Sequence, residues 1–134
     1  MMKNGLISWL EKKHIANECD LDRILGPMAF VVRQDGHIMF KGANTVFEKL
    51  FGWKNYQWSQ GMDAGHLLTR ESLEKFSSLL DRSSRKVFVE FTENINFKNL
   101  MGIVLKCRVH VCCISSNQSN VSYVLRASYN KQAQ

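Results

Sequence analysis

Apolar residues recur with helical spacing through the middle of the chain. The segment from Arg70 to Asp81 is the most regular, because its apolar side chains fall three or four positions apart on one stripe: Leu73, Phe76, Leu79 and Leu80. This spacing predicts an amphipathic helix with one buried face. Thr69, just before the segment, is a suitable N-cap.

A shorter helix is predicted directly after Asn44, whose side chain can accept a hydrogen bond from a free backbone N–H. Gly52 supplies the left-handed residue that commonly ends such a helix, and the ring of Trp53 can fold back at its exit. The helix is about two turns long, and its apolar face carries Val46, Phe47, Leu50 and Phe51.

From Lys86 onward the apolar spacing changes to two, which is typical of half-buried strands. Val87, Val89 and Phe91 alternate with Phe88, Glu90 and Thr92, and a break is expected from Glu93 to Asn99. Two further strands are predicted from Ile103 to Val111 and from Val121 to Tyr129, with a polar turn at Ser115 to Asn120 between them.

Two short apolar runs, Ala29 to Arg33 and His37 to Lys41, flank an Asp35-Gly36 pair that favours a hairpin turn. The sequence therefore predicts five strands with helices inserted between the second and third. This is an α+β fold, a five-stranded antiparallel sheet with one face covered by helices.

The first part of the chain predicts a flanking helix from Gly5 to Asn17, with Leu6, Trp9 and Leu10 on one face. This stripe either makes a dimer contact or caps its own domain, and the pattern does not decide between the two. We divide the chain into a flanking segment (1–24), a domain (25–130) and a tail (131–134).

Composition limits the number of domains and the location of the protein. A chain of 134 residues, 45% hydrophobic and 22% charged, suits one globular domain. No apolar run approaches the ~20 residues needed to cross a bilayer, so no membrane insertion is expected. The first ten residues are too polar at their end for a secretory signal, which favours an intracellular protein, cytoplasmic or nuclear.

The net charge of +6 permits an acidic partner. The basic residues are scattered rather than gathered in a run with interleaved aromatics, so direct nucleic-acid contact is not expected.

Candidate catalytic or metal-binding chemistry is not evident. The sequence has no phosphate loop and no nucleophile elbow, and its four cysteines have neither C-x-x-C spacing nor a histidine at zinc-finger distance. The histidines are isolated from one another. We therefore expect no enzyme and no metal site.

The segment Asn44-x-x-Phe47-x-x-Leu50-x-Gly52-Trp53 resembles the PAS (Per-Arnt-Sim) superfamily. Two flanking elements in the family's order strengthen the resemblance: the Asp35-Gly36 turn before it and, after it, Gly61, Leu67, Leu68 and Glu71. The resemblance covers roughly residues 25–130. The sequence departs from the family in two extra residues before Asn44, and in Thr69-Arg70 where the family usually has His-Pro.

The resemblance implies a sensory or interaction module and raises the question of a cofactor. Flavin-binding relatives carry a reactive cysteine where this chain has Tyr56-Gln57-Trp58-Ser59-Gln60-Gly61. Haem-binding relatives carry a histidine on the long helix; this chain has none there, and His66 on the preceding turn is the only plausible substitute. No cofactor is expected.

PAS domains often enclose a cavity between helices and sheet, and a small apolar ligand could occupy it. The expected lining consists of Phe40, Phe47, Leu50, Phe51, Leu68, Phe76, Leu80, Val89, Leu105, Cys107 and Leu125. With eight phenylalanines and no evident polar group to orient a ligand, a filled core is favoured over a cavity.

The expected function is a non-catalytic PAS-type module that binds another protein or a second copy of itself and is part of a larger regulator. The alternative is a sensor of a small molecule or cofactor. The expected interface comprises the first helix and the outer sheet face, with Leu6, Trp9, Leu10, Val32, Phe88, Val104 and Val124.

Overall fold

The protein folds around one antiparallel sheet in a computed structural model that describes residues 26–54, 61–117 and 119–129. The sheet has six strands in the order β3-β2-β1-β6-β5-β4. Their bounds are Met28–Gln34 (β1), His37–Ala43 (β2), Met62–Asp63 (β3), Glu90–Lys98 (β4), Val104–Ser116 (β5) and Asn120–Tyr129 (β6). The α+β class is as expected, but the prediction of five strands is wrong. The added strand, β3, has two residues and is too short to leave a period-two pattern.

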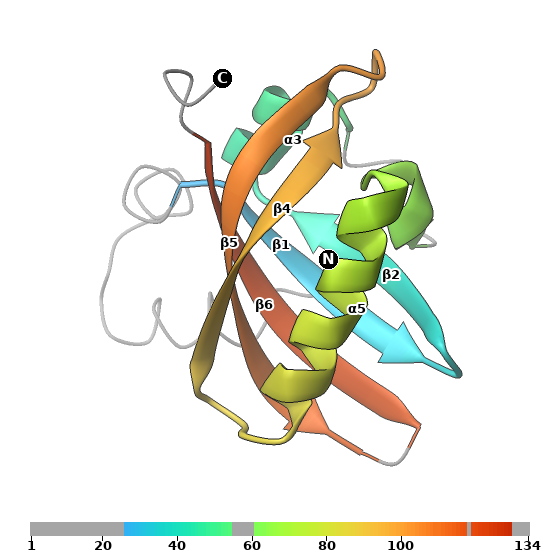
Figure 1. The fold of residues 1–134 in the computed structure, drawn as a ribbon, viewed down its shortest axis with the longest axis vertical. Coiled ribbons are helices and arrows are strands. Elements are labelled where there is room, and N and C mark those ends of the chain that lie inside the picture. Colours follow the sequence, from blue (N-terminus) through green and yellow to red (C-terminus); the bar gives the residue numbers. More distant parts are fainter. Residues whose placement is uncertain (1–25, 55–60, 118, 130–134) are drawn as a thin grey trace.

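The helices lie on one face of this sheet, the inner face, while the strands at the centre bring together the two ends of the domain (Figure 1). The short helix α3 is Thr45–Phe51, the 3-10 turn η1 is Ala64–His66 and the long helix α5 is Arg70–Ser84. β1 and β6 pair along their length, from Met28 opposite Arg126 to Gln34 opposite Asn120.

The predicted caps of the helices are confirmed, although α5 continues to Ser84, three residues beyond the predicted end at Asp81. The side chain of Asn44 accepts a hydrogen bond from the amide of Phe47, and Gly52 has the left-handed conformation, φ 81°. Thr69 caps α5 by accepting from the amide of Ser72. The Asp35-Gly36 pair forms the hairpin turn with positive φ at both residues, 52° and 80°. Each of these positions has the residue type that its backbone conformation favours.

The third predicted strand is displaced along the sequence. The period-two pattern placed it at Val87 to Thr92 with a break after it, whereas β4 runs from Glu90 to Lys98. Asn94 and Asn96 occupy outward positions of this strand and pair with Arg108 and Lys106 of β5. Their low strand propensity suggested a break, but cross-strand pairing and the burial of the apolar residues between them outweigh propensity.

One of the extra residues before Asn44 is absorbed within β2. Val31 of β1 lies opposite Phe40, but Phe30 lies opposite Gly42, so Lys41 is skipped in the pairing. This is a β-bulge, in which an added residue is accommodated without reversing the faces of the rest of the strand. The predicted flanking helix with Leu6, Trp9 and Leu10, and the tail, lie outside the described residues.

Candidate functional site

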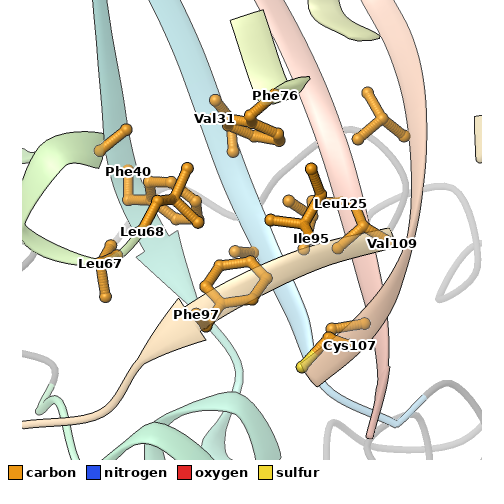
Figure 2. Packing of buried hydrophobic residues seen from close by; sticks show 14 of the residues in the cluster. Val31, Phe40, Leu67, Leu68, Phe76, Ile95, Phe97, Cys107, Val109 and Leu125 are labelled. Carbon is orange, nitrogen blue, oxygen red and sulfur yellow. The ribbon is translucent and has the colours of Figure 1, made fainter. Parts of the chain in front are cut away.

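The space between helices and sheet is the place where a ligand cavity was expected. Most of the predicted lining side chains do meet there in one buried cluster, as Figure 2 shows for several of them. Those with at most 8% exposure are Phe40, Phe47, Phe51, Leu68, Phe76, Leu80, Leu105, Cys107 and Leu125. Leu50 packs against the cluster from a half-buried position.

Aromatic rings occupy the centre of this cluster. Phe51 lies 4.8 Å from Phe97 and 4.5 Å from Phe47, measured between ring centroids. Phe40 stacks near Phe76 at 6.0 Å and meets Phe97 edge-on at 6.4 Å. These separations are within the range of direct aromatic packing. The five rings, each fully buried, fill the region between α3, α5 and the sheet.

Sequence reasoning missed Ile95 and Phe97 and misplaced Val89. Ile95 and Phe97 were assigned to a break, yet both are fully buried on the inner face of β4. The signal that could have found them is the alternation Asn94-Ile95-Asn96-Phe97-Lys98, which has period two. Val89 precedes β4 and is exposed, so its assignment to the cavity lining is wrong.

A polar cluster joins the C-terminal end of α5 to the sheet. Arg33 of β1 forms an ion pair with Asp81 of α5. The hydroxyl of Tyr123, on β6, donates to the carbonyl oxygen of Leu80 at 3.3 Å. Burial lowers the pKa of Arg33, but its hydrogen bonds with Asp81 and Tyr123 outweigh burial and leave that pKa above its ordinary value. The guanidinium thus holds helix and sheet together at this end.

Burial raises the pKa of two other side chains on the inner face, Cys107 and Tyr123. It raises the pKa of the Cys107 thiol to about 12, so this thiol is neutral and unreactive at neutral pH. Burial also raises the pKa of Tyr123, against the hydrogen bond with Arg33, which lowers it. Both groups therefore behave as structural members of the core.

The outer face of the sheet carries the other predicted contact residues, but they do not form one surface. Val104, exposed, begins β5, whereas Phe88 donates its amide to Cys113 near the opposite end of that strand. Nine residues of strand separate the two, about 30 Å. Val32 is half-buried on β1.

Val124 was also expected to be bare, and this is wrong. It is 3% exposed, although its position in β6 places it on the outer row between Phe30 and Cys112. Both of its neighbours are half-buried. A residue in a central strand is flanked on both sides by other side chains, which explains the difference from Val104 at a strand end.

The segment Val87–Val89 is the most unusual part of the surface. All three residues are exposed, and Phe88 is 74% exposed with a positive φ of 68°. A left-handed backbone is rare for a bulky residue and costs about 1–3 kcal/mol. Packing against the described core does not offset this strain, because the ring points to solvent. Such strain at an exposed aromatic residue is typical of a binding site.

A charged network lies beside this segment on the outer face. Glu90 accepts from Arg126 at 3.0 Å and lies 3.4 Å from the ring nitrogen Nδ1 of His110. Thr92 lies 3.3 Å from the same nitrogen. Apolar side chains bordered by partly exposed charges are the usual anatomy of a protein interface.

Two expectations concern metals and membranes. Within the described residues, no group of three or more His, Cys, Asp or Glu side chains could hold a metal ion. None of the helices among those residues is both long enough and apolar enough to cross a bilayer.

Comparison with known proteins identifies the fold. No family model and no curated protein matches the sequence. A PAS domain from Colwellia psychrerythraea superposes with a TM-score of 0.66 at 16% identity, over 92% of this chain and 98% of that one. The PAS domain of an HTR-like protein from Haloarcula marismortui gives 0.61 at 13% identity, over 96% and 100%.

A third similar structure is the PAS-B domain of Drosophila melanogaster Cycle with bound ethylene glycol. Its TM-score is 0.61 at 9% identity, over 76% of this chain and 99% of that chain. At 9–16% identity these likenesses show the fold alone. The chain therefore has a PAS-like fold, with an antiparallel sheet of six strands whose inner face is covered by helices.

Proposed function

We propose that this chain is a non-catalytic, intracellular PAS-type signalling module, part of a larger regulator, that acts by binding a second copy of itself. The contact surface consists of Val87–Val89 together with Phe30, Val32 and Cys112 of the outer sheet face. We name it the outer-face surface. The predicted helix from Gly5 to Asn17 contributes to the same contact.

The observation that carries the proposal is the strained, exposed Phe88. Its backbone is fixed by a 2.8 Å hydrogen bond from its own amide to the carbonyl of Cys113, which places the ring at the edge of the outer face. Aromatic residues held rigidly at a surface lose little entropy on binding, and they are frequent energetic centres of interfaces.

The neighbouring charges suit a contact between two identical surfaces. Arg85 and Lys86 precede the apolar segment, and Glu90 follows it. In a two-fold arrangement the basic residues of one copy can face the acidic residue of the other, because each copy presents the same surface. In a dimer of this kind the basic residues of one copy would add to the contacts that Glu90 already makes with Arg126 and His110.

The experiment compares the oligomeric state of the full chain with that of two variants by sedimentation velocity. The wild type is expected to dimerise. Phe88→Asn removes the ring and tolerates the left-handed backbone, so this variant should be monomeric and somewhat more stable. Met101→Asn is the matched control, since Met101 is also exposed but lies outside the outer-face surface; it should dimerise like the wild type.

A monomeric wild type at all concentrations, or a dimer unaffected by Phe88→Asn, would overturn the proposal. A monomer that binds an unrelated chain through Phe88 would keep the interaction function and replace the partner.

A second candidate is a sensor of a small molecule. One observation favours it: the indole nitrogen Nε1 of Trp53, at the edge of the core cluster, is buried and has no hydrogen-bond acceptor among the residues that the structure describes. A ligand acceptor there would satisfy that donor. The packed phenylalanine rings argue against a large ligand. Native mass spectrometry separates the candidates, because a retained ligand adds its mass to the chain.

A further inference from the structure

The turn between β4 and β5 carries a second exposed apolar group, far from the outer-face surface. Met101 is 83% exposed, and the other three apolar residues of the turn, Leu100, Ile103 and Val104, are exposed as well. The ribbon of the hairpin extends past the body of the domain at its upper end in Figure 1, so its turn is a convex tip that carries these exposed residues. We call residues 99–104 the hairpin tip.

The backbone of the hairpin tip is held by the protein itself. The side-chain oxygen of Asn99 accepts from the amides of Met101 and Ile103, each at 2.9 Å. The amide of Asn99 donates to the carbonyl of Ile103, and the amide of Gly102 donates to the carbonyl of Asn99. The turn therefore presents its apolar side chains in a fixed arrangement rather than as a loose loop.

One more bond attaches this turn to the helical layer. The amide of Leu100 donates to the carbonyl of Phe51, the last residue of α3, at 2.8 Å. All five amide N–H groups from Asn99 to Ile103 thus have partners within the protein. Because these donors are already satisfied, the segment can enter an apolar medium without the penalty for unpaired N–H groups.

Basic residues flank the tip on the outer face of the hairpin, and this stretch of the hairpin has no acidic residue. Between Asn94 and Arg108 the sequence contains Lys98, Lys106 and Arg108 but no Asp or Glu. Lys98 lies directly opposite Val104, and Lys106 lies opposite Asn96. The chain as a whole carries a net charge of +6. The exposed apolar side chains of the tip therefore adjoin a basic border, which we define as Lys98, Lys106 and Arg108 on the outer face of the hairpin.

We propose that the hairpin tip docks the protein on an anionic lipid surface. The apolar side chains enter the boundary between headgroups and acyl chains, while the three basic residues bind lipid phosphate and carboxylate groups. A convex tip suits a bilayer better than a protein partner, because a protein would need a complementary pocket whereas lipids rearrange around the inserted side chains. Burial of apolar area and attraction of basic residues are the two energies that drive such peripheral binding.

This inference is independent of dimerisation, because the outer-face surface lies at the other end of β5. A dimer, if formed, adds a second tip and strengthens binding through avidity.

The test is co-sedimentation of the full chain with vesicles of phosphatidylcholine alone or mixed with phosphatidylserine. We expect binding to the mixed vesicles, little to the neutral ones, and weakening as salt is raised. Met101→Asp should reduce the affinity for mixed vesicles at least tenfold, since it replaces an inserted apolar group with a charge that anionic lipid repels. Lys98→Gln with Lys106→Gln should reduce it about tenfold or more and remove most of the salt dependence.

Phe88→Asn is the matched control, because it removes an exposed apolar side chain at the opposite end. The affinity of this variant for mixed vesicles should fall only as far as the loss of dimer avidity accounts for. A separate control, thermal unfolding, should show that Met101→Asp folds like the wild type. Failure of the wild type to bind mixed vesicles overturns the proposal, as does equal binding by Met101→Asp. Equal binding to neutral vesicles overturns the role of the basic border.

Discussion

Asn44 and Met28 bind each other through a reciprocal pair of hydrogen bonds. The amide of Asn44 donates to the carbonyl of Met28 at 2.9 Å, and the amide of Met28 donates to the side-chain oxygen of Asn44 at 3.0 Å. The same oxygen caps α3 through the amide of Phe47, while the side-chain nitrogen donates to the carbonyl of Gly26. One buried amide thus joins the first strand to the first described helix, and it needs both an acceptor and a donor.

Asn44→Ala should therefore lower the free energy of unfolding by about 2–4 kcal/mol, because it leaves two amide donors and one carbonyl without their side-chain partner. Urea denaturation measures this loss. Asn44→Asp is the informative control, since it keeps the acceptor and loses the donor; its stability should lie between those of wild type and Asn44→Ala. Equal losses in both variants would show that the donor to Gly26 carries all the stabilisation.

Local signals in the sequence predicted the elements that depend on local chemistry. Asn44, Gly52, Thr69 and the Asp35-Gly36 turn were assigned correctly because each position requires a residue type with a special backbone or capping role. The long helix was located for a similar reason: its apolar stripe is unbroken over three turns.

The errors lie where tertiary structure outweighs local preference. Ile95 and Phe97 were missed because the low strand propensity of Asn94 and Asn96 was given more weight than the period-two alternation around them, and the pairing with β5 that outweighs propensity is not visible in the local sequence. Phe88 was expected on the outer face of a strand; it is exposed, but it precedes β4, and only the structure shows its left-handed backbone. Val124 required knowledge of the strand order, which separates central from edge positions.

Phe97 is the centre of the aromatic cluster, and Phe97→Ala should cost about 3–5 kcal/mol of stability by leaving a cavity. The cavity is lined by aromatic and aliphatic carbon, so it should bind a small apolar molecule such as benzene. We therefore expect added benzene to raise the melting temperature of the variant and leave that of the wild type unchanged.

Phe91→Ala serves as the control for this ligand effect, because Phe91 is only partly buried at the other end of β4. It should lose less stability and gain nothing from benzene. An equal rise in the wild type would indicate a native cavity and would favour the small-molecule sensor over the filled core.

The buried thiol of Cys107 predicts a loss of stability in alkaline solution. Its pKa is raised from 9.0 to about 12 in the folded protein, so the unfolded chain loses this proton first as pH rises. Stability from this group is complete below pH 9 and falls between pH 9 and 12, by about 1.4 kcal/mol per pH unit. Cys107→Val should reduce the slope of unfolding free energy against pH in that window.

Leu105→Val is the comparison for this measurement, as it alters the same strand without changing a titratable group. It should lower stability by a similar amount at pH 7.5 and at pH 10.5, with reductant present in both series. If Cys107→Val keeps the full wild-type slope, the alkaline loss comes from other groups, among them Tyr123, whose pKa burial also raises.

Alanine substitutions at Gly52 and Gly36 test the contact between α3 and the hairpin tip, because the two glycines share a backbone conformation and only Gly52 lies beside the tip. Both have a left-handed backbone, with φ of 81° and 80°. A Cβ at Gly36 would meet nothing within 4 Å, whereas a Cβ at Gly52 would lie 3.2 Å from the Cβ of Leu100. Gly36→Ala should therefore show the backbone cost alone, about 1–2 kcal/mol, and Gly52→Ala should lose roughly 1 kcal/mol more.

The added loss in Gly52→Ala should be accompanied by a change at the tip, because Leu100 must move away from α3 and strain its hydrogen bond to Phe51. Hydrogen exchange of the Leu100 amide measures this directly and should accelerate in Gly52→Ala but not in Gly36→Ala. Equal exchange rates in the two variants would mean that the tip yields without breaking the bond. In that case the rigidity of the tip would come from Asn99 alone, and Asn99→Ala would be the substitution that loosens it.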